Sequence, residues 1–228
     1  MKLYSVVPRV LQTFAWVPTY IMFVTRASFS IIGARNLHGY SKVIFACNHV
    51  SEWDPIVLTA AALRLGYTPM FYVAAPDKEF NDDLFGWRKH IYKSWFFRSW
   101  GSYPIVRGEK DYAKALAAHV RIISDGFSIC IFPEGAVNRD GKLKEAKGGV
   151  VYLMHATQVP IIPTYIHGTY RSPFSAVISG KRNISVTFAA PILPSELEDL
   201  HSVSPDEYKR VASMVTSSLQ ALKSSVTT

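Results

Sequence analysis

The chain has 228 residues, of which 49% are hydrophobic and 18% are charged, with a formal net charge of +8 and a pI near 9.4. This length suits one α/β domain with an N-terminal appendage and is sufficient for a sizeable core. The low charge content argues against a freely soluble protein, and the basic balance indicates an anionic partner: nucleic acid, an acidic membrane surface or a phosphorylated substrate.

The N-terminal part contains an uncharged stretch from Val10 to Thr25 that is rich in aromatic and aliphatic residues. It is shorter than the roughly 20 apolar residues of a transmembrane helix, and Pro18 interrupts it. We therefore expect a helix lying in one leaflet, with basic side chains on anionic headgroups; these are Lys2, Arg9, Arg26 and Arg35. The alternative is a helix packed on the core. No cleavage site of the signal-peptide kind is evident, so we do not expect its removal.

The first buried strand is predicted from Lys42 to Cys47 and leads into Asn48-His49-Val50-Ser51-Glu52-Trp53-Asp54. A helix is predicted to follow, opening with Pro55-Ile56-Val57-Leu58. An imidazole and a carboxylate are thus expected in the turn between a strand and a helix. If the chain folds back into the first helical turn, Asp54 can bind one nitrogen of His49 and leave the other to take a proton.

The same residues have a purely structural explanation. Asp54 before Pro55 is a good helix N-cap, and Ser51 with Asp54 can form a capping box. The spacing of His49 and Asp54 alone therefore does not distinguish catalysis from helix capping.

The middle of the chain combines aromatic and basic side chains. A buried strand is expected over residues 69–75, and aromatic residues alternate with Arg and Lys from Leu84 to Trp100. Such a stretch suits stacking on nucleic-acid bases, and it equally suits the membrane interface. Because the N-terminal stretch is uncharged, we favour the membrane and expect no nucleic-acid partner. A core helix with basic side chains reaching solvent is the alternative.

The rest of the chain alternates predicted strands and helices. Strands are expected over residues 101–107, 127–132, 159–166 and 183–189, and helices over 110–125, 147–156 and 204–222. Capping boxes are predicted at Ser195 with Glu198 and at Ser204 with Glu207. This order predicts an α/β fold with a mixed, largely parallel central sheet covered by helices on both faces. We divide the chain into an N-terminal membrane-associating helical segment, residues 1–35, and an α/β domain, residues 36–228.

Two cysteines, Cys47 and Cys130, each lie inside an apolar run. We expect buried, reduced thiols rather than a disulfide or a metal pair, which fits a cytosolic setting. A metal centre at His49 and Asp54 is not expected, because no second His or carboxylate pair stands at ligand spacing.

Four stretches match a family pattern in order and spacing. They are the motif from Asn48 to Asp54; Gly101 to Arg107; Phe132-Pro133-Glu134-Gly135 with Gly141, Leu143 and Lys147-Gly148 beyond it; and Val159-Pro160-Ile161-Ile162-Pro163. With them the chain resembles the glycerolipid acyltransferases, most closely the 1-acylglycerol-3-phosphate (lysophosphatidate) acyltransferases. The resemblance extends over residues from about 40 to 170.

The resemblance implies transfer of a fatty acyl group from acyl-CoA or acyl carrier protein to the free hydroxyl of lysophosphatidate, giving phosphatidate. It implies that His49 is the general base and that Asp54 orients it. It implies no metal or redox cofactor. With the basic charge and the N-terminal stretch, we expect association with an anionic membrane surface on the cytoplasmic face.

The resemblance also assigns the substrate-binding residues. Arg107 and Lys147 are expected to hold the acceptor phosphate, and Glu134 to contact the acceptor's glycerol, to brace the site or simply to form an ion pair. Backbone N–H groups near Gly135 are expected to stabilise the oxyanion formed on the thioester. The residues expected to shape the motif loops are Asn48, Ser51, Phe132 and Pro133.

One segment departs from the family pattern. The family continues after Phe-Pro-Glu-Gly with Thr-Arg-Ser, where this chain has Ala136-Val137-Asn138. Arg139 lies two positions beyond the missing arginine, and it is expected either to supply the lost charge or to be a solvated loop residue. The departure keeps two alternatives open: an acyltransferase for another lysophospholipid or glycolipid, and a non-catalytic lipid-surface binding protein.

Overall fold

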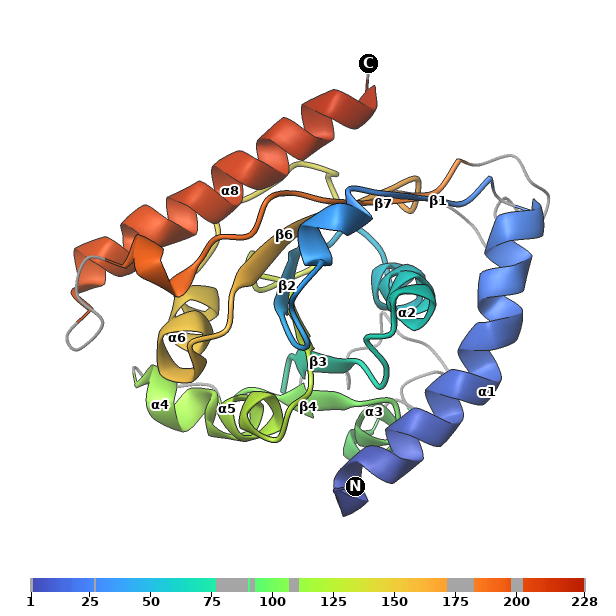
Figure 1. Ribbon diagram of the computed structural model, residues 1–228, viewed down its shortest axis with the longest axis horizontal. Helices are drawn as coiled ribbons and strands as arrows, with labels where there is room; N and C mark the ends of the chain where they lie inside the picture. Colours follow the sequence, from blue (N-terminus) through green and yellow to red (C-terminus); the bar gives the residue numbers. More distant parts are fainter. Residues whose placement is uncertain are drawn as a thin grey trace.

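A seven-stranded sheet forms the centre of this computed structural model, which describes residues 2–26, 28–76, 90, 93–106, 111–171, 183–197 and 203–227. The strand order is β1-β7-β6-β2-β5-β3-β4 (Figure 1). The strands are β1 (Ser30–Ile32), β2 (Ile44–Cys47), β3 (Phe71–Ala74), β4 (Ser102–Pro104), β5 (Ile129–Ile131), β6 (Ile161–His167) and β7 (Ser185–Phe188). Among the described residues, β6 and β7 are the only neighbouring strands of this sheet that pair antiparallel, and the other neighbours pair in parallel. The prediction of a mixed, largely parallel sheet is therefore confirmed.

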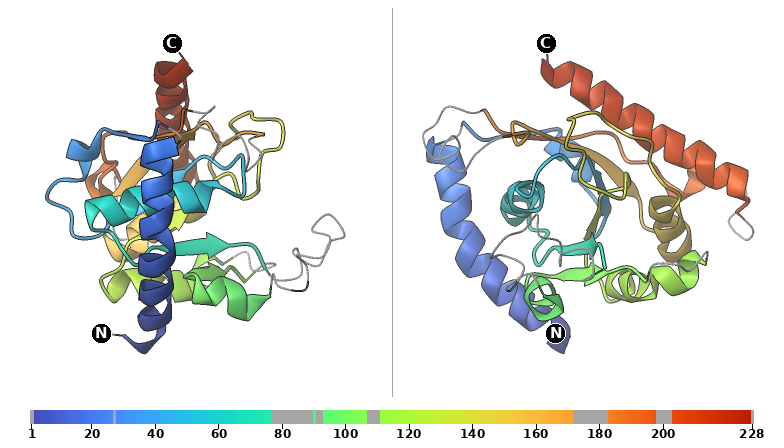
Figure 2. Two further views of the ribbon diagram at one scale, coloured as in Figure 1. Left: turned by 90° about the vertical axis from the view of Figure 1, so that its right-hand side faces the viewer. Right: turned by 180° about the vertical axis from the view of Figure 1, so that it is seen from behind.

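Helices cover both faces of the sheet, as predicted. In the described residues they are α1 (Leu3–Arg26), α2 (Asp54–Leu65), α3 (Ser94–Ser99), α4 (Tyr112–Ala115), α5 (Ala117–Ser124), α6 (Gly149–Thr157), α8 (Pro205–Thr227) and the short 3₁₀ helices η1 (Ala34–Leu37) and η4 (Pro194–Glu196). Helices α1 and α2 lie on one side of the sheet, and α6 and α8 lie on the opposite side (Figure 1, Figure 2).

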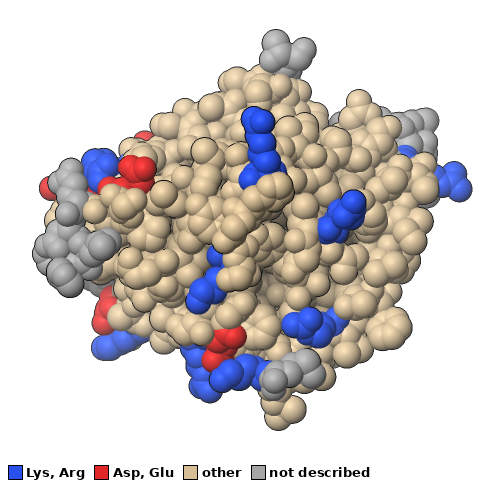
Figure 3. Space-filling view, in the orientation of Figure 1, with Lys and Arg blue, Asp and Glu red and all other residues tan. Residues whose placement is uncertain are grey.

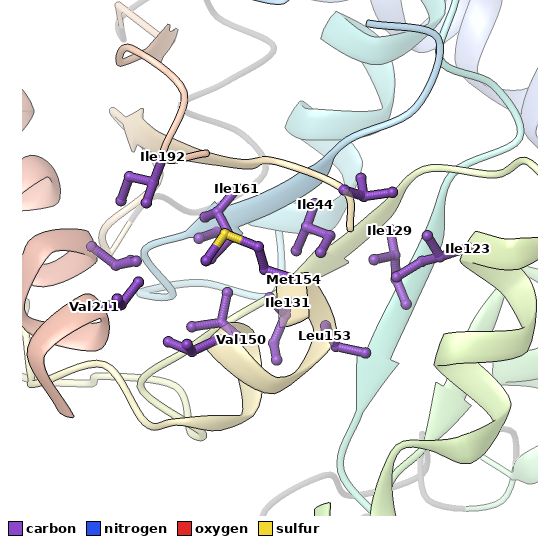
Figure 4. Packing of buried hydrophobic residues seen from close by; sticks show 14 of the residues in the cluster. Ile44, Ile123, Ile129, Ile131, Val150, Leu153, Met154, Ile161, Ile192 and Val211 are labelled. Carbon is purple, nitrogen blue, oxygen red and sulfur yellow. The ribbon is translucent and has the colours of Figure 1, made fainter. Parts of the chain in front are cut away.

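Strand β2 lies between β5 and β6 and is buried along its whole length. Because side chains alternate along a strand, Phe45 and Cys47 join the core under α1 and α2, whereas Ile44 and Ala46 join the core under α5, α6 and α8. Figure 4 shows the second core, in which Ile44 lies close to Met154 of α6. A strand packed on both faces reads as a continuous apolar run, which is why residues 42–47 were recognisable in the sequence.

Several boundaries differ from the prediction. The helix expected over residues 110–125 is two helices, α4 and α5, because Leu116 leaves helical geometry and Val106 donates its N–H to the Ala115 carbonyl at 3.3 Å. The helix expected to contain Lys147 begins at Gly149 instead, because the Lys147 N–H donates to the Pro133 carbonyl at 2.9 Å. Strand β1 was not predicted; its three residues carry too short a pattern.

Helix α1 is docked firmly on the rest of the molecule. The Gln12 amide bonds both backbone groups of Met70, at 2.8 Å each, and its Nε2 also donates to the Trp100 carbonyl at 3.0 Å. Phe23 is fully buried, and Lys2 pairs with Asp125 at 3.0 Å.

Among the described residues, no helix combines the length and the apolar character needed to span a membrane. The division of the chain at residue 35 stays a prediction.

The predicted aromatic and basic stretch from Leu84 to Trp100 lies mostly outside the described residues. Its described part forms α3, on which Trp95 is 65% exposed. Trp100 packs beside Trp16 of α1, with ring centroids 5.5 Å apart. Glu198 of the predicted capping box also lies outside the described residues.

Candidate active site

The turn between β2 and α2 folds back on itself, as the motif requires. The Asp54 Oδ2 atom accepts hydrogen bonds from the backbone N–H groups of Val50 and Ser51 at 2.7 and 2.9 Å. The Ser51 hydroxyl accepts from the Trp53 N–H at 3.2 Å. The helix N-cap is Trp53, so Asp54 is the first helical residue and its side chain reaches backwards over the turn. Closing the turn and orienting a histidine are therefore compatible tasks for the same carboxylate.

The same carboxylate oxygen holds the imidazole of His49. The His49 Nδ1 atom lies 2.9 Å from Asp54 Oδ2, which leaves the Nε2 atom outside this bond. The Asp54 side chain is fully buried, whereas the His49 side chain is 16% exposed. Phe132 stacks on the imidazole with ring centroids 3.9 Å apart and an interplanar angle of 16°. Two contacts thus fix the ring: Asp54 sets its direction, and Phe132 sets its plane.

The backbone of His49 is held from the loop after β5. Its N–H donates to Glu134 Oε1 at 3.2 Å, and its carbonyl accepts from the Asn138 N–H at 2.7 Å. The other oxygen of Glu134 accepts from the Lys144 N–H at 2.7 Å and from the Asn138 side-chain amide. Burial raises the pKa of Glu134, and the hydrogen bonds from Lys144, His49 and Asn138 oppose that rise. Glu134 therefore braces two loops through N–H donors.

Asn48 fastens the motif turn to β6. Its side-chain Nδ2 donates to the Ile166 carbonyl at 3.0 Å, and its Oδ1 accepts from the Ile166 N–H at 2.7 Å. This pair extends the bonding between the parallel strands β2 and β6 beyond Cys47. The role expected of Asn48, that of shaping the loop, agrees with this geometry.

Gly135 closes a tight turn beside His49. Its N–H donates to the Phe132 carbonyl at 3.0 Å, and its φ of +80° is one that side chains rarely tolerate. A Cβ atom at this position would lie 2.5 Å from the Lys147 Nζ atom. The ammonium group of Lys147 therefore lies directly over Gly135, next to the bracing residue Glu134.

The other two cations expected at the phosphate site, Arg139 and Arg107, have no described contact with the Gly135 turn. Arg139 is exposed, and its carbonyl accepts from the Tyr170 hydroxyl at 3.3 Å. Arg107 lies outside the described residues. The guanidinium of Arg171 packs 5.3 Å from the ring centroid of Tyr170, the residue whose hydroxyl bonds the Arg139 carbonyl.

A model of the acyltransferase family matches residues 28–167. The chain belongs to the acyltransferase family. That match spans β1 to β6 and so includes the His49 turn and the loop after β5.

Two curated relatives of this chain carry closely related names. A Mycoplasma pneumoniae protein, "Probable 1-acyl-sn-glycerol-3-phosphate acyltransferase", is 25% identical over 70% of this chain and 60% of its own length. A "1-acyl-sn-glycerol-3-phosphate acyltransferase" from Limnanthes douglasii is 40% identical over 22% of this chain and 18% of its own length. The match thus spans less than two thirds of either relative.

A solved structure has the same fold as this chain. The crystal structure of the 1-acyl-sn-glycerophosphate (LPA) acyltransferase PlsC from Thermotoga maritima aligns with a TM-score of 0.62 at 18% identity. The alignment covers 95% of this chain and 79% of that one. At this identity the likeness shows the shared fold.

The sequence analysis missed two residues that contact the candidate site. Asn138 bonds both His49 and Glu134, although the prediction singled out its segment only as a departure from the family. Thr169 donates its hydroxyl to Asp54 Oδ1 at 2.7 Å. A signal for Thr169 existed: it is a polar residue just beyond a predicted strand, and the carboxyl ends of parallel strands meet at one edge of a sheet. Within the described residues, no group of three or more His, Cys, Asp or Glu side chains could hold a metal ion.

Proposed function

We propose that this protein transfers a fatty acyl group from an acyl thioester to the free hydroxyl of lysophosphatidate, giving phosphatidate. The observation that carries the proposal is the His49–Asp54 pair, with its 2.9 Å bond, at the carboxyl edge of the sheet of a chain in the acyltransferase family. The names of the curated relatives support lysophosphatidate as the acceptor. We propose acyl-CoA or acyl carrier protein as the donor, and no resident cofactor.

In the proposed reaction, His49 acts as the general base, and the geometry of the His49–Asp54 pair supports this role. With Nδ1–H bonded to Asp54, the Nε2 atom of His49 accepts the proton of the acceptor hydroxyl while its oxygen attacks the thioester carbonyl. The buried carboxylate of Asp54 stabilises the imidazolium that forms. When the tetrahedral intermediate collapses, the carbon–sulfur bond breaks and the proton passes from His49 to the leaving thiolate. Such general acid–base catalysis typically accelerates a reaction about 10²- to 10⁴-fold.

The oxyanion of that intermediate needs fixed donors beside the Gly135 turn. The N–H of Gly135 already donates to the Phe132 carbonyl. We therefore assign the role to the next N–H groups of the loop, those of Ala136 and Val137.

Lys147 is our first candidate for the acceptor phosphate, because its ammonium lies over Gly135 in the same loop. We propose that Arg139 also contributes charge to the phosphate, and the resemblance to the family implies the same for Arg107. A charged hydrogen bond to phosphate contributes about 1.5–3 kcal/mol. The chain thereby replaces the arginine that is missing at Val137.

We propose that α1 attaches the enzyme to an anionic membrane surface on the cytoplasmic side. Its solvent-facing side carries apolar residues spaced three and four apart, each between 41% and 88% exposed: Leu3, Val7, Val10, Phe14, Val17, Ile21 and Val24. An apolar stripe of this length along a docked helix suits insertion into the headgroup and acyl boundary. Basic side chains are scattered over the mostly uncharged face in Figure 3, and the net charge of +8 favours anionic lipid.

The test is product analysis with the full chain on vesicles. Each vesicle preparation contains one acceptor (lysophosphatidate, lysophosphatidylcholine or monoacylglycerol), and each is supplied with acyl-CoA or acyl carrier protein thioester. We expect phosphatidate from lysophosphatidate and little product from the two acceptors without a terminal phosphate. Product from lysophosphatidylcholine or monoacylglycerol, with none from lysophosphatidate, would overturn the proposal that lysophosphatidate is the acceptor. No acylated lipid with either thioester would overturn the reaction.

A further inference from the structure

The Asp54 carboxylate has two oxygens with different tasks. Oδ2 receives His49 Nδ1 and the N–H groups of Val50 and Ser51, at 2.7–2.9 Å. Oδ1 receives the hydroxyl of Thr169 at 2.7 Å. Asp54 is fully buried and Thr169 is 1% exposed, so in the described part of the chain this oxygen faces protein rather than solvent.

The fold brings Thr169 to Asp54 from 115 residues away. Thr169 lies two residues beyond the end of β6, and β6 pairs in parallel with β2, whose end leads to His49. The Asn48 side chain holds the two strand ends together through both backbone groups of Ile166. The Thr169 hydroxyl is therefore placed by the pairing of β2 with β6 and by the Asn48 amide rather than by a loop alone.

A hydroxyl on Oδ1 fixes the rotation of the carboxylate about its Cβ–Cγ bond. The Oδ1 of an ionised carboxylate is an acceptor, so Thr169 donates to it. Without this donor the carboxylate group can rotate, which lengthens the bond from Oδ2 to the imidazole of His49. It would also lose one of the four donors that support its buried charge.

We propose that Thr169 is a positioning residue of the acyl transfer, which acts by holding Asp54 in the rotation that orients His49. The inference rests on the proposed function, because it requires His49 to be the base. It assigns a catalytic consequence to a residue outside the four motifs by which the sequence resembled its family.

The main test compares matched variants at position 169 in the full chain, on vesicles that contain lysophosphatidate. Thr169→Val keeps the side-chain shape and removes the hydroxyl, and it should lower kcat about 10- to 100-fold. The KM values of both substrates should stay within about twofold. Thr169→Ser keeps the hydroxyl and should retain kcat within about threefold of wild type.

A second pair guards against a simple folding defect. Thr169→Ala and Thr169→Ser leave nearly the same space and differ in the hydroxyl. At equal circular dichroism and equal unfolding temperature, a fast Ser variant and a slow Ala variant support positioning. Equal kcat values in this pair overturn it.

Two backgrounds separate this inference from the mechanism on which it rests. In an Asp54→Asn background, Thr169→Val should lower kcat by less than about a further twofold, because the carboxylate that Thr169 positions is gone. A further loss as large as that in the wild-type background overturns action through Asp54. If His49→Ala transfers as fast as wild type, the mechanism and the inference both fail. If His49→Ala is inactive while Thr169→Ala is fully active, the inference alone fails.

Discussion

His49 and His119 lie in two different regions of the molecule, and in each region the imidazole forms a hydrogen bond with an oxygen atom. At the carboxyl edge of the sheet, His49 bonds the carboxylate of Asp54 and remains 16% exposed. In α5, His119 bonds the Tyr103 carbonyl at 3.0 Å and is fully buried. Burial lowers the pKa of His119 to about 4, although its bond to Tyr103 acts in the opposite direction.

The difference shows what an imidazole needs in order to carry a proton. A carboxylate stabilises the imidazolium, whereas a neutral carbonyl compensates poorly for the loss of solvent. Exposure matters as well, since a substrate has to reach the second nitrogen. Nδ1 of His119 is buried and has no hydrogen-bond partner in the described residues. His119 therefore fills a structural position, whereas His49 has the carboxylate partner and the exposure that the proposed base requires.

The largest loss of activity is expected from a substitution that makes the surroundings of His49 resemble those of His119. Asp54→Asn gives His49 a neutral oxygen partner, as His119 has, so the imidazolium loses its counter-charge. We expect kcat for phosphatidate formation to fall about 10³- to 10⁴-fold, with substrate KM values nearly unchanged. A fall of less than about tenfold would show that the carboxylate charge is not needed.

The next effect concerns Lys147, whose ammonium lies over Gly135. Lys147→Ala should raise the KM for lysophosphatidate about 10- to 100-fold and leave the KM for the thioester unchanged. Arg139→Ala should raise the same KM by less than about fivefold, because the side-chain atoms nearest to Gly135 belong to Lys147 and not to Arg139.

Lys144→Ala is the matched control for Lys147→Ala. It removes the same charge from the same loop, but Lys144 contacts Glu134 through its backbone N–H rather than through its ammonium. Equal effects from the two lysine variants would point to the overall charge of the loop instead of a phosphate contact at Lys147.

A smaller effect is expected at the membrane. Phe14 is 78% exposed in the middle of the apolar stripe of α1. Phe14→Asp should weaken binding to anionic vesicles by about tenfold in a sedimentation assay, since burial of such a side chain contributes about 1.5–3 kcal/mol. Gln220→Asp, on the exposed side of α8, adds the same charge as a control. Equal losses from both variants would attribute binding to charge rather than to the stripe.

The smallest effect on activity is expected at His119. His119→Gln should leave kcat within about twofold of wild type while it changes the dependence of stability on pH. Because the pKa of His119 falls from 6.5 in the unfolded chain to about 4 in the fold, its contribution is full above pH 6.5 and is lost as the pH falls toward 4.

Chemical unfolding at two pH values checks this prediction. Wild type should lose about 2 kcal/mol of stability from this group between pH 7 and pH 5, and His119→Gln should not show that part of the loss. An equal decline in both proteins would show that His119 takes up its proton as readily in the fold as in the unfolded chain.

The parts of the site that could be predicted from the sequence depend on short-range contacts. Asp54 lies five residues from His49, so a strand, a turn and a helix start suffice to bring them together. Glu134 and Thr169 reach the same turn from 85 and 115 residues away. Their contacts depend on β5 and β6 flanking β2, an order that no local pattern encodes.

The same distinction between local and long-range contacts explains which parts of the fold could be predicted from the sequence. Buried strands such as β2 appear as apolar runs, and the alternation of strands with helices predicts their parallel pairing. For α1 the sequence favoured a helix lying in one leaflet over a helix packed on the core, although the uncharged stretch from Val10 to Thr25 suits both lipid and core. Its docking involves contacts that composition does not reveal, such as the Gln12 amide that satisfies the backbone of Met70 and the fully buried ring of Phe23. The apolar stripe on the opposite side shows that the same helix has a second apolar face.

The most direct test of the central claim is the rate of phosphatidate formation by His49→Ala, measured on lysophosphatidate vesicles at saturating thioester. The side chain is partly exposed at the edge of the sheet, so the variant should keep its unfolding temperature and its vesicle binding. We predict a loss of at least about 10²-fold in kcat, the usual contribution of a positioned base. A folded, vesicle-bound His49→Ala that forms phosphatidate at the wild-type rate would contradict the account.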